Sequence, residues 1–396
     1  MQTELAPRFR NQPFGPEAKA ILGACVHCGF CTATCPTYLD RRDERDSPRG
    51  RIYLIKSFLE GGEAGAGTRR HLDRCLTCRS CETTCPSGVR YGRLIDIARN
   101  VMEHEIPRNP VQRLFRWAVR RLFGDPALAA LAMMGARLLG RLPAAGAMGV
   151  WPPPRHKRVV LALAGCVQPS ATPATNHAAA RILDRLGISL VAAPEAGCCG
   201  ALDHHLGAGQ DGRDRIRANI DAWWPAIEKG AEAVLPTASG CGAMIADYGA
   251  QMADDPAYAD KARRVSALVR DPANLLLGEN LAALRPRLGI GRIAVHVPCS
   301  QQHALGAPDA VETLLRRLGF QLVPAPDKHL CCGSAGTYSI FEPGMARRLR
   351  RRKLDALQSN RPDLIVTANV GCQLHLGAKA GVPVRHWLEL LDDLPS

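Results

Sequence analysis

Residues 25–36 read CVHCGFCTATCP, and residues 75–86 read CLTCRSCETTCP. Both stretches follow the pattern C-x2-C-x2-C-x3-C-P, and the second repeats the first at a constant shift of 50 residues. Between them, residues 47–62 read SPRGRIYLIKSFLEGG, with a serine suited to cap a helix, a proline suited to its first turn and two glycines suited to end it. We therefore expect the N-terminal region to be mainly helical and to carry two cysteine-rich loops.

The cysteine spacing of both loops is the one that holds two iron–sulfur clusters in bacterial ferredoxins. Three thiolates on a tight loop bind three corners of one 4Fe–4S cluster, and the fourth, beside the proline, reaches the other cluster. Zinc is the alternative, but zinc sites pair two C-x2-C elements and need no third spacing. The first predicted cluster is held by Cys25, Cys28, Cys31 and Cys85, and the second by Cys75, Cys78, Cys81 and Cys35. Two clusters held in this way lie close together, which favours an electron-transfer protein.

A second, longer repeat accounts for the other cysteines. In each copy 31 residues separate a single cysteine from a Cys-Cys-Gly turn, and a last cysteine follows after 41 residues in one copy and 39 in the other. The first copy contains Cys166, Cys198, Cys199 and Cys241, and the second contains Cys299, Cys331, Cys332 and Cys372. Four thiols suit an iron–sulfur cluster or an all-thiolate zinc site. The alternatives are a set of buried reduced thiols or a disulfide at the Cys-Cys turn.

The sequence around this repeat alternates between apolar, β-branched runs and amphipathic runs. RVVLALAGC at 158–166 and RIAVHVPC at 292–299 read as buried strands, and helical patterns follow that end at Gly187 and Gly319. Such alternation predicts parallel sheets with helices on their faces. Ligand sites in these sheets lie at the carboxyl ends of the strands, where the single cysteines of the repeat are expected.

These patterns predict an α+β multidomain protein. A helical, ferredoxin-type two-cluster domain is followed by two tandem α/β domains with parallel sheets. The expected boundaries are 1–105 for the helical domain, 106–155 for a basic helical linker, and 156–290 and 291–396 for the two cysteine-rich domains.

Composition excludes several classes of protein. Hydrophobic residues make up 46% of the 396 residues and charged residues 22%, which excludes a disordered or fibrous chain. No apolar run approaches the roughly 20 residues of a membrane-spanning helix, and MQTELAPRFR at the N-terminus has no apolar signal-peptide core. We therefore expect a cytoplasmic protein, in which sixteen cysteines favour metal or redox chemistry over structural disulfides.

The net charge of +14 is concentrated between residues 106 and 158, which hold ten basic residues and one acid. Within this segment RNPVQRLFRWAVRRLF, at 108–123, predicts an amphipathic helix with an apolar face and an arginine face. A basic amphipathic helix can lie on an anionic membrane or bind an acidic partner. The alternative is a solvated arginine face on a helix that packs internally. No nucleic-acid-binding motif accompanies the charge, so we expect no nucleic acid partner.

Several stretches together resemble one known family. They are CVHCGFCTATCPTY (25–38), SPRGRIYLIK (47–56), HLDRCLTCRSCETTCPSGVRYG (71–92), NIDAWWPAIE (219–228), TASGCG (237–242), HLCCGSAGTY (329–338), TANVGCQ (367–373) and VRHW (384–387). The chain resembles the iron–sulfur subunit of bacterial glycolate oxidase from about residue 1 to about residue 390. Its C-terminal half also resembles the CCG domains of heterodisulfide reductase, anaerobic glycerol-3-phosphate dehydrogenase and lactate-utilisation proteins.

The resemblance implies a complex in which separate FAD-containing subunits oxidise glycolate to glyoxylate, with D-lactate as a secondary substrate. This chain would carry no FAD and no catalytic residue of its own. It would pass electrons to a quinone acceptor, at the cytoplasmic face of the inner membrane. The alternatives are the iron–sulfur subunit of a quinone-linked glycerol-3-phosphate dehydrogenase and a thiol/disulfide reductase of the heterodisulfide-reductase type.

One departure from the heterodisulfide-reductase type concerns the last cysteine of each copy. In that type a further cysteine follows in a C-x2-C pair, and five thiolates hold a noncubane cluster. Met244 and His375 stand at the matching positions here, which argues against such a cluster. Methionine is a weak ligand, whereas His375 is a competent candidate ligand. We interpret His296 and His303, which flank Cys299, as structural or surface residues.

Overall fold

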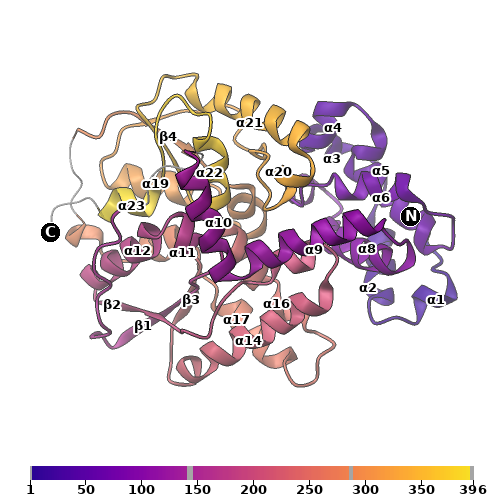
Figure 1. Ribbon diagram of the computed structural model, residues 1–396, viewed down its shortest axis with the longest axis horizontal. Coiled ribbons are helices and arrows are strands. Elements are labelled where there is room, and N and C mark those ends of the chain that lie inside the picture. The colour runs from indigo at the N-terminus through magenta and orange to yellow at the C-terminus, as the bar shows by residue number, and fades with distance from the viewer. Residues whose placement is uncertain (1, 141–145, 285–288, 393–396) are drawn as a thin grey trace.

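The computed structural model describes residues 2–140, 146–284 and 289–392. The N-terminal helices form one end of the molecule, and two parallel sheets with their covering helices form the rest (Figure 1). Helices α9 (Pro110–Gly124) and α10 (Pro126–Leu138) connect the two parts. The predicted fold class is thereby confirmed.

The helical part surrounds an apolar core made chiefly by α2, α5 and α8. The Ser47 hydroxyl caps α5 by accepting a hydrogen bond from the Gly50 amide at 2.9 Å, and Pro48 occupies the first turn. Gly61 follows the helix in the left-handed region with φ of 96°. The elements are α1 (Pro7–Arg10), α2 (Gly15–Ala24), α3 (Phe30–Thr34), α4 (Pro36–Arg41), η1 (Glu44–Asp46), α5 (Pro48–Leu59), α6 (Ala66–Asp73), α7 (Ser80–Thr83) and α8 (Tyr91–Glu105).

The first cysteine-rich repeat forms a three-stranded parallel sheet in the order β2-β1-β3. The central strand β1 (Arg158–Ala162) lies between β2 (Ile188–Ala192) and β3 (Ala233–Leu235). The helices are α11 (Gln168–Ala171), α12 (Ala174–Arg185), α13 (Ala201–His205), α14 (Gly209–Glu228), α15 (Ser239–Ala246), α16 (Tyr248–Gln251), α17 (Ala259–Leu268), α18 (Pro272–Leu277) and η2 (Leu281–Ala283).

The second repeat forms a four-stranded parallel sheet in the order β5-β4-β6-β7. Its strands are β4 (Ile293–His296), β5 (Leu322–Val323), β6 (Leu364–Thr367) and β7 (Val384–His386). The apolar run at 292–299 predicts β4, whereas β7 is short and partly exposed and has no such signal. The helices are η3 (Ser300–Ala304), α19 (Ala310–Arg317), α20 (Tyr338–Phe341), α21 (Pro343–Gln358), α22 (Val370–Gly377) and α23 (Trp387–Asp392).

The two repeats share one hydrophobic core that contains residues of both sheets. Helix α12 of the first repeat packs against α23 of the second. Two polar pairs hold this contact: Thr175 donates to Glu389 at 2.5 Å, and Arg181 donates to Asp392 at 2.9 Å. The repeats therefore form one packed unit on which the helical part is placed.

Helix α9 turns part of its arginine face toward the protein. Arg120 donates to Asp203 at 2.9 Å, and Arg116 donates to the Leu206 carbonyl at 3.2 Å. On the other side Val111 and Leu114 are 77% and 64% exposed. The alternative of a solvated arginine face does not apply to these two arginines, because the Asp203 carboxylate on α13 and the Leu206 carbonyl after it accept hydrogen bonds from them.

A fully buried carboxylate, Asp46, organises the helical part. It accepts from Arg41 at 2.8 Å and His71 at 2.8 Å, and it pairs with the equally buried Arg51 at 3.5 Å. Arg51 also donates to the His71 carbonyl at 2.7 Å. A buried charge with several partners is costly to leave unpaired, so these side chains depend on one another.

We expect Asp46→Asn to lower the free energy of unfolding by about 3–5 kcal/mol, because it leaves the Arg51 guanidinium buried without its carboxylate. The measurement is chemical denaturation followed by circular dichroism. Asp43→Asn is the matched control, since it removes a carboxylate from a neighbouring, exposed pair with Arg45. Equal denaturation midpoints for the two variants would contradict the role given to Asp46.

Candidate metal centres and the cavity between them

The two ferredoxin-type loops have the same unusual backbone conformation. His27 and Gly29 have positive φ values of 56° and 88°, and Thr77 and Arg79, at a shift of 50 residues, have values of 51° and 59°. Positive φ is uncommon for residues other than glycine. These residues bend each loop back on itself, so that its first three thiols converge.

The fourth cysteine of each motif lies near the opposite loop. Each follows a short helix, α3 or α7, and these two helices pack against each other. The Thr34 hydroxyl donates to the Ser80 carbonyl at 3.4 Å across this contact. One small cavity is lined by Cys25, Cys28, Cys31 and Cys85, and a second by Cys35, Cys75, Cys78 and Cys81, the last of which also borders the first cavity.

In the first repeat, the turns that follow the strands bring four thiols together: Cys166 after β1, Cys198 and Cys199 after β2, and Cys241 in the first turn of α15. Hydrogen bonds among these thiols lower the pKa of Cys198 and raise the pKa of Cys166 and of Cys199. Cys198 is therefore the thiol of the three that loses its proton first. Gly200 ends the turn at φ of 87°, where a Cβ would lie 2.9 Å from the Gly212 carbonyl oxygen. The turn therefore requires glycine.

The second repeat brings its thiols together in the same way. The Cys299 and Cys331 sulfurs are 3.9 Å apart, and the Cys332 and Cys372 sulfurs are 3.3 Å apart. Gly333 has the same role as Gly200, with φ of 90° and a Cβ position 2.8 Å from the Ala346 carbonyl oxygen. The chemistry of both donor sets, four thiols in a buried turn region, fits an iron–sulfur cluster or a zinc ion.

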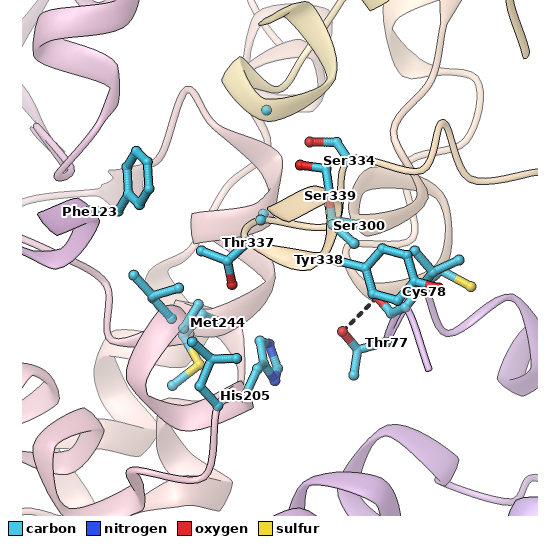
Figure 2. A pocket seen from close by; sticks show the side chains of 18 of the residues that line it. Thr77, Cys78, Phe123, His205, Met244, Ser300, Ser334, Thr337, Tyr338 and Ser339 are labelled. Carbon is cyan, nitrogen blue, oxygen red and sulfur yellow. Dashed lines mark hydrogen bonds between the residues drawn. The ribbon is translucent and has the colours of Figure 1, made fainter. Parts of the chain in front are cut away.

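A cavity of about 1050 Å³ lies between the helical part and both repeats. Figure 2 shows Thr77 and Cys78 of a ferredoxin-type loop facing residues of both repeats, among them Met244 and Ser334. All eight cysteines of the second repeat motif line this cavity, together with Cys75 and Cys78. One ferredoxin-type site and both cysteine quartets thus border a common space.

Polar contacts fix the helical part against this cavity. Arg79 pairs with Asp247 of the first repeat, and Thr83 shares a hydrogen bond of 2.9 Å with His303 of the second. Asp96 on α8 lies 2.9 Å from a ring nitrogen of His205 on α13. Burial alone would raise the pKa of Asp96. The positive charges of His205 and His204, and the hydrogen bonds that they donate, lower this pKa well below its usual value.

An apolar contact joins the second ferredoxin-type loop to the second repeat. Leu76 and Cys78 belong to the same hydrophobic cluster as Cys331, Tyr338 and Leu349. Cys78 is also close enough to Cys299 for their charges to interact. Cys78 therefore lies at the packed contact between a ferredoxin-type site and the second quartet.

The structure places the other sequence-predicted candidates differently. The ring of His375 lines the cavity, but its Nε2 donates to the Ala346 carbonyl at 3.2 Å. Met244 also borders the cavity, and it packs into the apolar core of the first repeat. His296 instead lies beside Cys332 and Cys372, which sequence reasoning missed. The signal was a lone histidine in the apolar run 292–299, at the position that Leu163 occupies in the first copy.

Comparisons with known proteins agree with this architecture. A model of the 4Fe-4S dicluster domain matches residues 21–89, and a model of the CCG cysteine-rich domain matches residues 160–246 and 293–377. The glycolate oxidase iron–sulfur subunit of Escherichia coli (strain K12) is 53% identical over 99% of this chain and 98% of its own length. The chain belongs to the family of glycolate oxidase iron–sulfur subunits.

Two more distant relatives cover different shares of this chain. The probable glycolate oxidase iron–sulfur subunit of Bacillus subtilis (strain 168) is 30% identical over 89% of this chain and 87% of its own length. Lactate utilization protein A of Bacillus licheniformis is 27% identical over 55% of this chain and 92% of its own length. In the part of the chain that the structure describes, no helix combines the length and the apolar character needed to cross a bilayer.

Proposed function

We propose that this chain conducts electrons within a glycolate oxidase complex. A partner subunit that contains FAD would oxidise glycolate to glyoxylate, and D-lactate would be a secondary substrate. The electrons would pass through this chain to a quinone acceptor. The observation that carries the proposal is the convergence of one ferredoxin-type site and both cysteine quartets on one cavity.

We propose crossed ligation for two 4Fe–4S clusters. Cys25, Cys28 and Cys31 hold one cluster with Cys85, and Cys75, Cys78 and Cys81 hold the other with Cys35. The two small cavities lined by these sets support this assignment. When bound, each cluster supplies a centre that accepts and releases one electron. The two cysteine quartets of the repeats are proposed to hold a further iron–sulfur cluster or zinc.

Residues of the chain also tune the second ferredoxin-type site. The buried guanidinium of Arg51 is close enough to Cys35 and Cys75 for their charges to interact. Burial alone would lower the pKa of Arg51, but the ionised forms of the neighbouring Tyr91, Cys75, Cys35 and Asp46 raise it above its usual value. A fixed positive charge beside a set of thiolates stabilises added electrons, so Arg51 favours the reduced form of this site.

Serine substitutions test the crossed ligation. We expect Cys35→Ser to perturb the cluster built on the loop 75–81, and Cys85→Ser to perturb the cluster built on the loop 25–31. The measurement is EPR of the dithionite-reduced, anaerobically purified chain, with iron analysis against about eight irons for two intact clusters. Loss of only the cluster on the same motif as the substituted cysteine would refute this arrangement, and stoichiometric zinc with fewer than about four irons would exclude both clusters.

The proposed electron path is tested with the complex as purified. We expect glycolate to reduce the flavin of a complex that carries Cys35→Ser at the wild-type rate, while reduction of a soluble quinone analogue falls at least about tenfold, because the path loses a cluster ligand. Stopped-flow absorbance separates the two steps. The chain alone should not oxidise glycolate, and turnover by the flavin-free chain would exclude a purely electron-transferring role.

The exposed face of α9 and α10 supports a peripheral position on an anionic membrane. Leu114 and Trp117 on α9 are 64% and 56% exposed, and Leu131 and Leu138 on α10 are 59% and 82% exposed. Arg113 and Arg121 on α9 are also exposed, and Asp125 is the one acid among residues 106–158. Apolar side chains beside basic residues are typical of helices that lie in the membrane interface.

We expect the purified chain to bind phosphatidylglycerol vesicles more strongly than phosphatidylcholine vesicles, and less strongly as salt is raised. Leu114→Asp should weaken this binding about tenfold, since burying such a side chain contributes about 1.5 kcal/mol or more. Tyr53→Asp is the matched control, because Tyr53 is 61% exposed on α5, in another part of the molecule. Sedimentation measures the bound fraction. Equal loss in both variants, or no binding to either vesicle, would contradict the membrane proposal.

A further inference from the structure

His296 is the last residue of β4, and it is buried without a hydrogen bond. Its side chain is 1% exposed, and neither Nδ1 nor Nε2 has a partner among the described residues. Leaving a buried polar group unsatisfied costs about 1–3 kcal/mol. A histidine kept at such a position therefore needs a compensating interaction.

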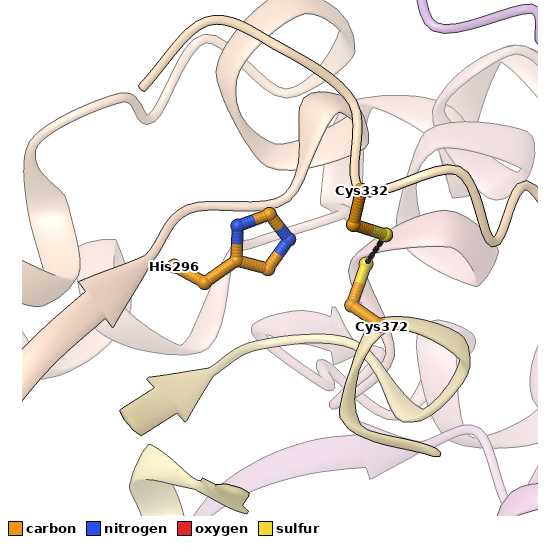
Figure 3. Close-up of side chains that lie close together, drawn as sticks. All are labelled: His296, Cys332 and Cys372. Atoms are coloured by element: carbon orange, nitrogen blue, oxygen red, sulfur yellow. Dashed lines mark hydrogen bonds between the residues drawn. The ribbon is translucent and has the colours of Figure 1, made fainter. Parts of the chain in front are cut away.

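The ring faces two cysteines of the second repeat. Figure 3 shows the imidazole directed toward the sulfurs of Cys332 and Cys372. One ring nitrogen and the two sulfurs lie within 4.8 Å of one another, and the sulfurs are 3.3 Å apart. Two thiolates on one tetrahedral ion, each at about 2.3 Å from it, are about 3.8 Å apart. The three atoms are thus close to the separations that a shared metal ion sets.

The fold itself does not require a histidine here. Leu163 occupies the same position in the first repeat, three residues before Cys166, and it packs into the apolar core. Two other histidines near the second quartet have partners: His375 bonds the Ala346 carbonyl, and His303 bonds Thr83. Among the described residues, His296 is the fully buried histidine beside the quartet whose two ring nitrogens have no hydrogen-bond partner.

We propose that His296 is a ligand, through a ring nitrogen, of the metal centre held by Cys332 and Cys372. The second quartet would then be a mixed imidazole and thiolate site, whereas the first would be held by thiolates alone. Imidazole and thiolate together suit zinc or an iron of a cluster. This inference rests on the proposal that the quartets hold metal.

A neutral imidazole also has an electrical consequence if it takes the coordination position of one of the four thiolates. The ligand set then carries one negative charge less, as in clusters where histidine replaces cysteine and the reduction potential rises. A second quartet that holds iron in this way would be easier to reduce than the first quartet. The repeats would then differ in function although they share a fold.

The test compares four full-length proteins purified anaerobically: wild type, His296→Leu, His296→Cys and His375→Gln. His296→Leu installs the residue of the first repeat, and His375→Gln is the matched control at the other histidine near the quartet. Iron, acid-labile sulfide and zinc are measured per chain. We expect the zinc content of His296→Leu to fall at least about threefold, or its iron content to fall by the iron of one centre. The EPR signals of the ferredoxin-type clusters should keep their intensity. His296→Cys and His375→Gln should keep the metal.

Spectroscopy of the wild-type protein tests the bond directly and does not depend on any variant folding. We expect nitrogen at about 2.0–2.1 Å in the zinc X-ray absorption spectrum, or a nitrogen hyperfine coupling in pulsed EPR if the centre is iron. Sulfur ligands alone, an unchanged metal content in His296→Leu, or a chain that holds only the two ferredoxin-type clusters would each overturn the inference. Loss of those two clusters would instead overturn the proposed function, so the two failures are distinguishable.

Discussion

The structure gathers the sixteen cysteines around three cavities, and much of the architecture serves that arrangement. A thiol can join a metal site only within a few ångströms of its partners, so each group needs backbone segments that turn sharply and are held from outside. The ferredoxin-type loops achieve this with left-handed residues and paired short helices, and the repeats achieve it with Cys-Cys-Gly turns at the ends of parallel strands. The ion pairs of Asp46 with Arg41 and Arg51 stabilise the ferredoxin-type loops from the interior of the helical part.

Contacts between the helical part and the two repeats also fix the positions of the cysteine groups relative to one another. The two repeats share a core and so form a single support. Arg79, Thr83 and Asp96 attach the helical part to this support by polar contacts, which leaves the loop around Cys78 against the second quartet. Electron transfer between fixed centres requires a series of sites that packed, buried contacts hold in place.

Sequence patterns predicted well the features that depend on local physics. The Ser47 cap, the helix that follows it and the strands 158–162 and 293–296 are where capping residues and apolar runs indicate them. Strand β7 had no such signal, because three residues, two of them only partly buried, become a strand only by pairing with β6. The orientation of α9 was not predictable either, since an amphipathic pattern identifies two faces but not which one meets the protein.

The sequence by itself determined the spacing of the thiols, the two repeats and hence the fold class, because tight loops, caps and buried strands are specified by residues close together in the chain. Only the tertiary structure decided which distant groups meet. It brought His296 to Cys332 and Cys372, turned His375 to a carbonyl, and assembled one cavity from three parts of the chain. These contacts join residues tens to hundreds of positions apart, and they depend on how whole elements pack, which no local pattern encodes.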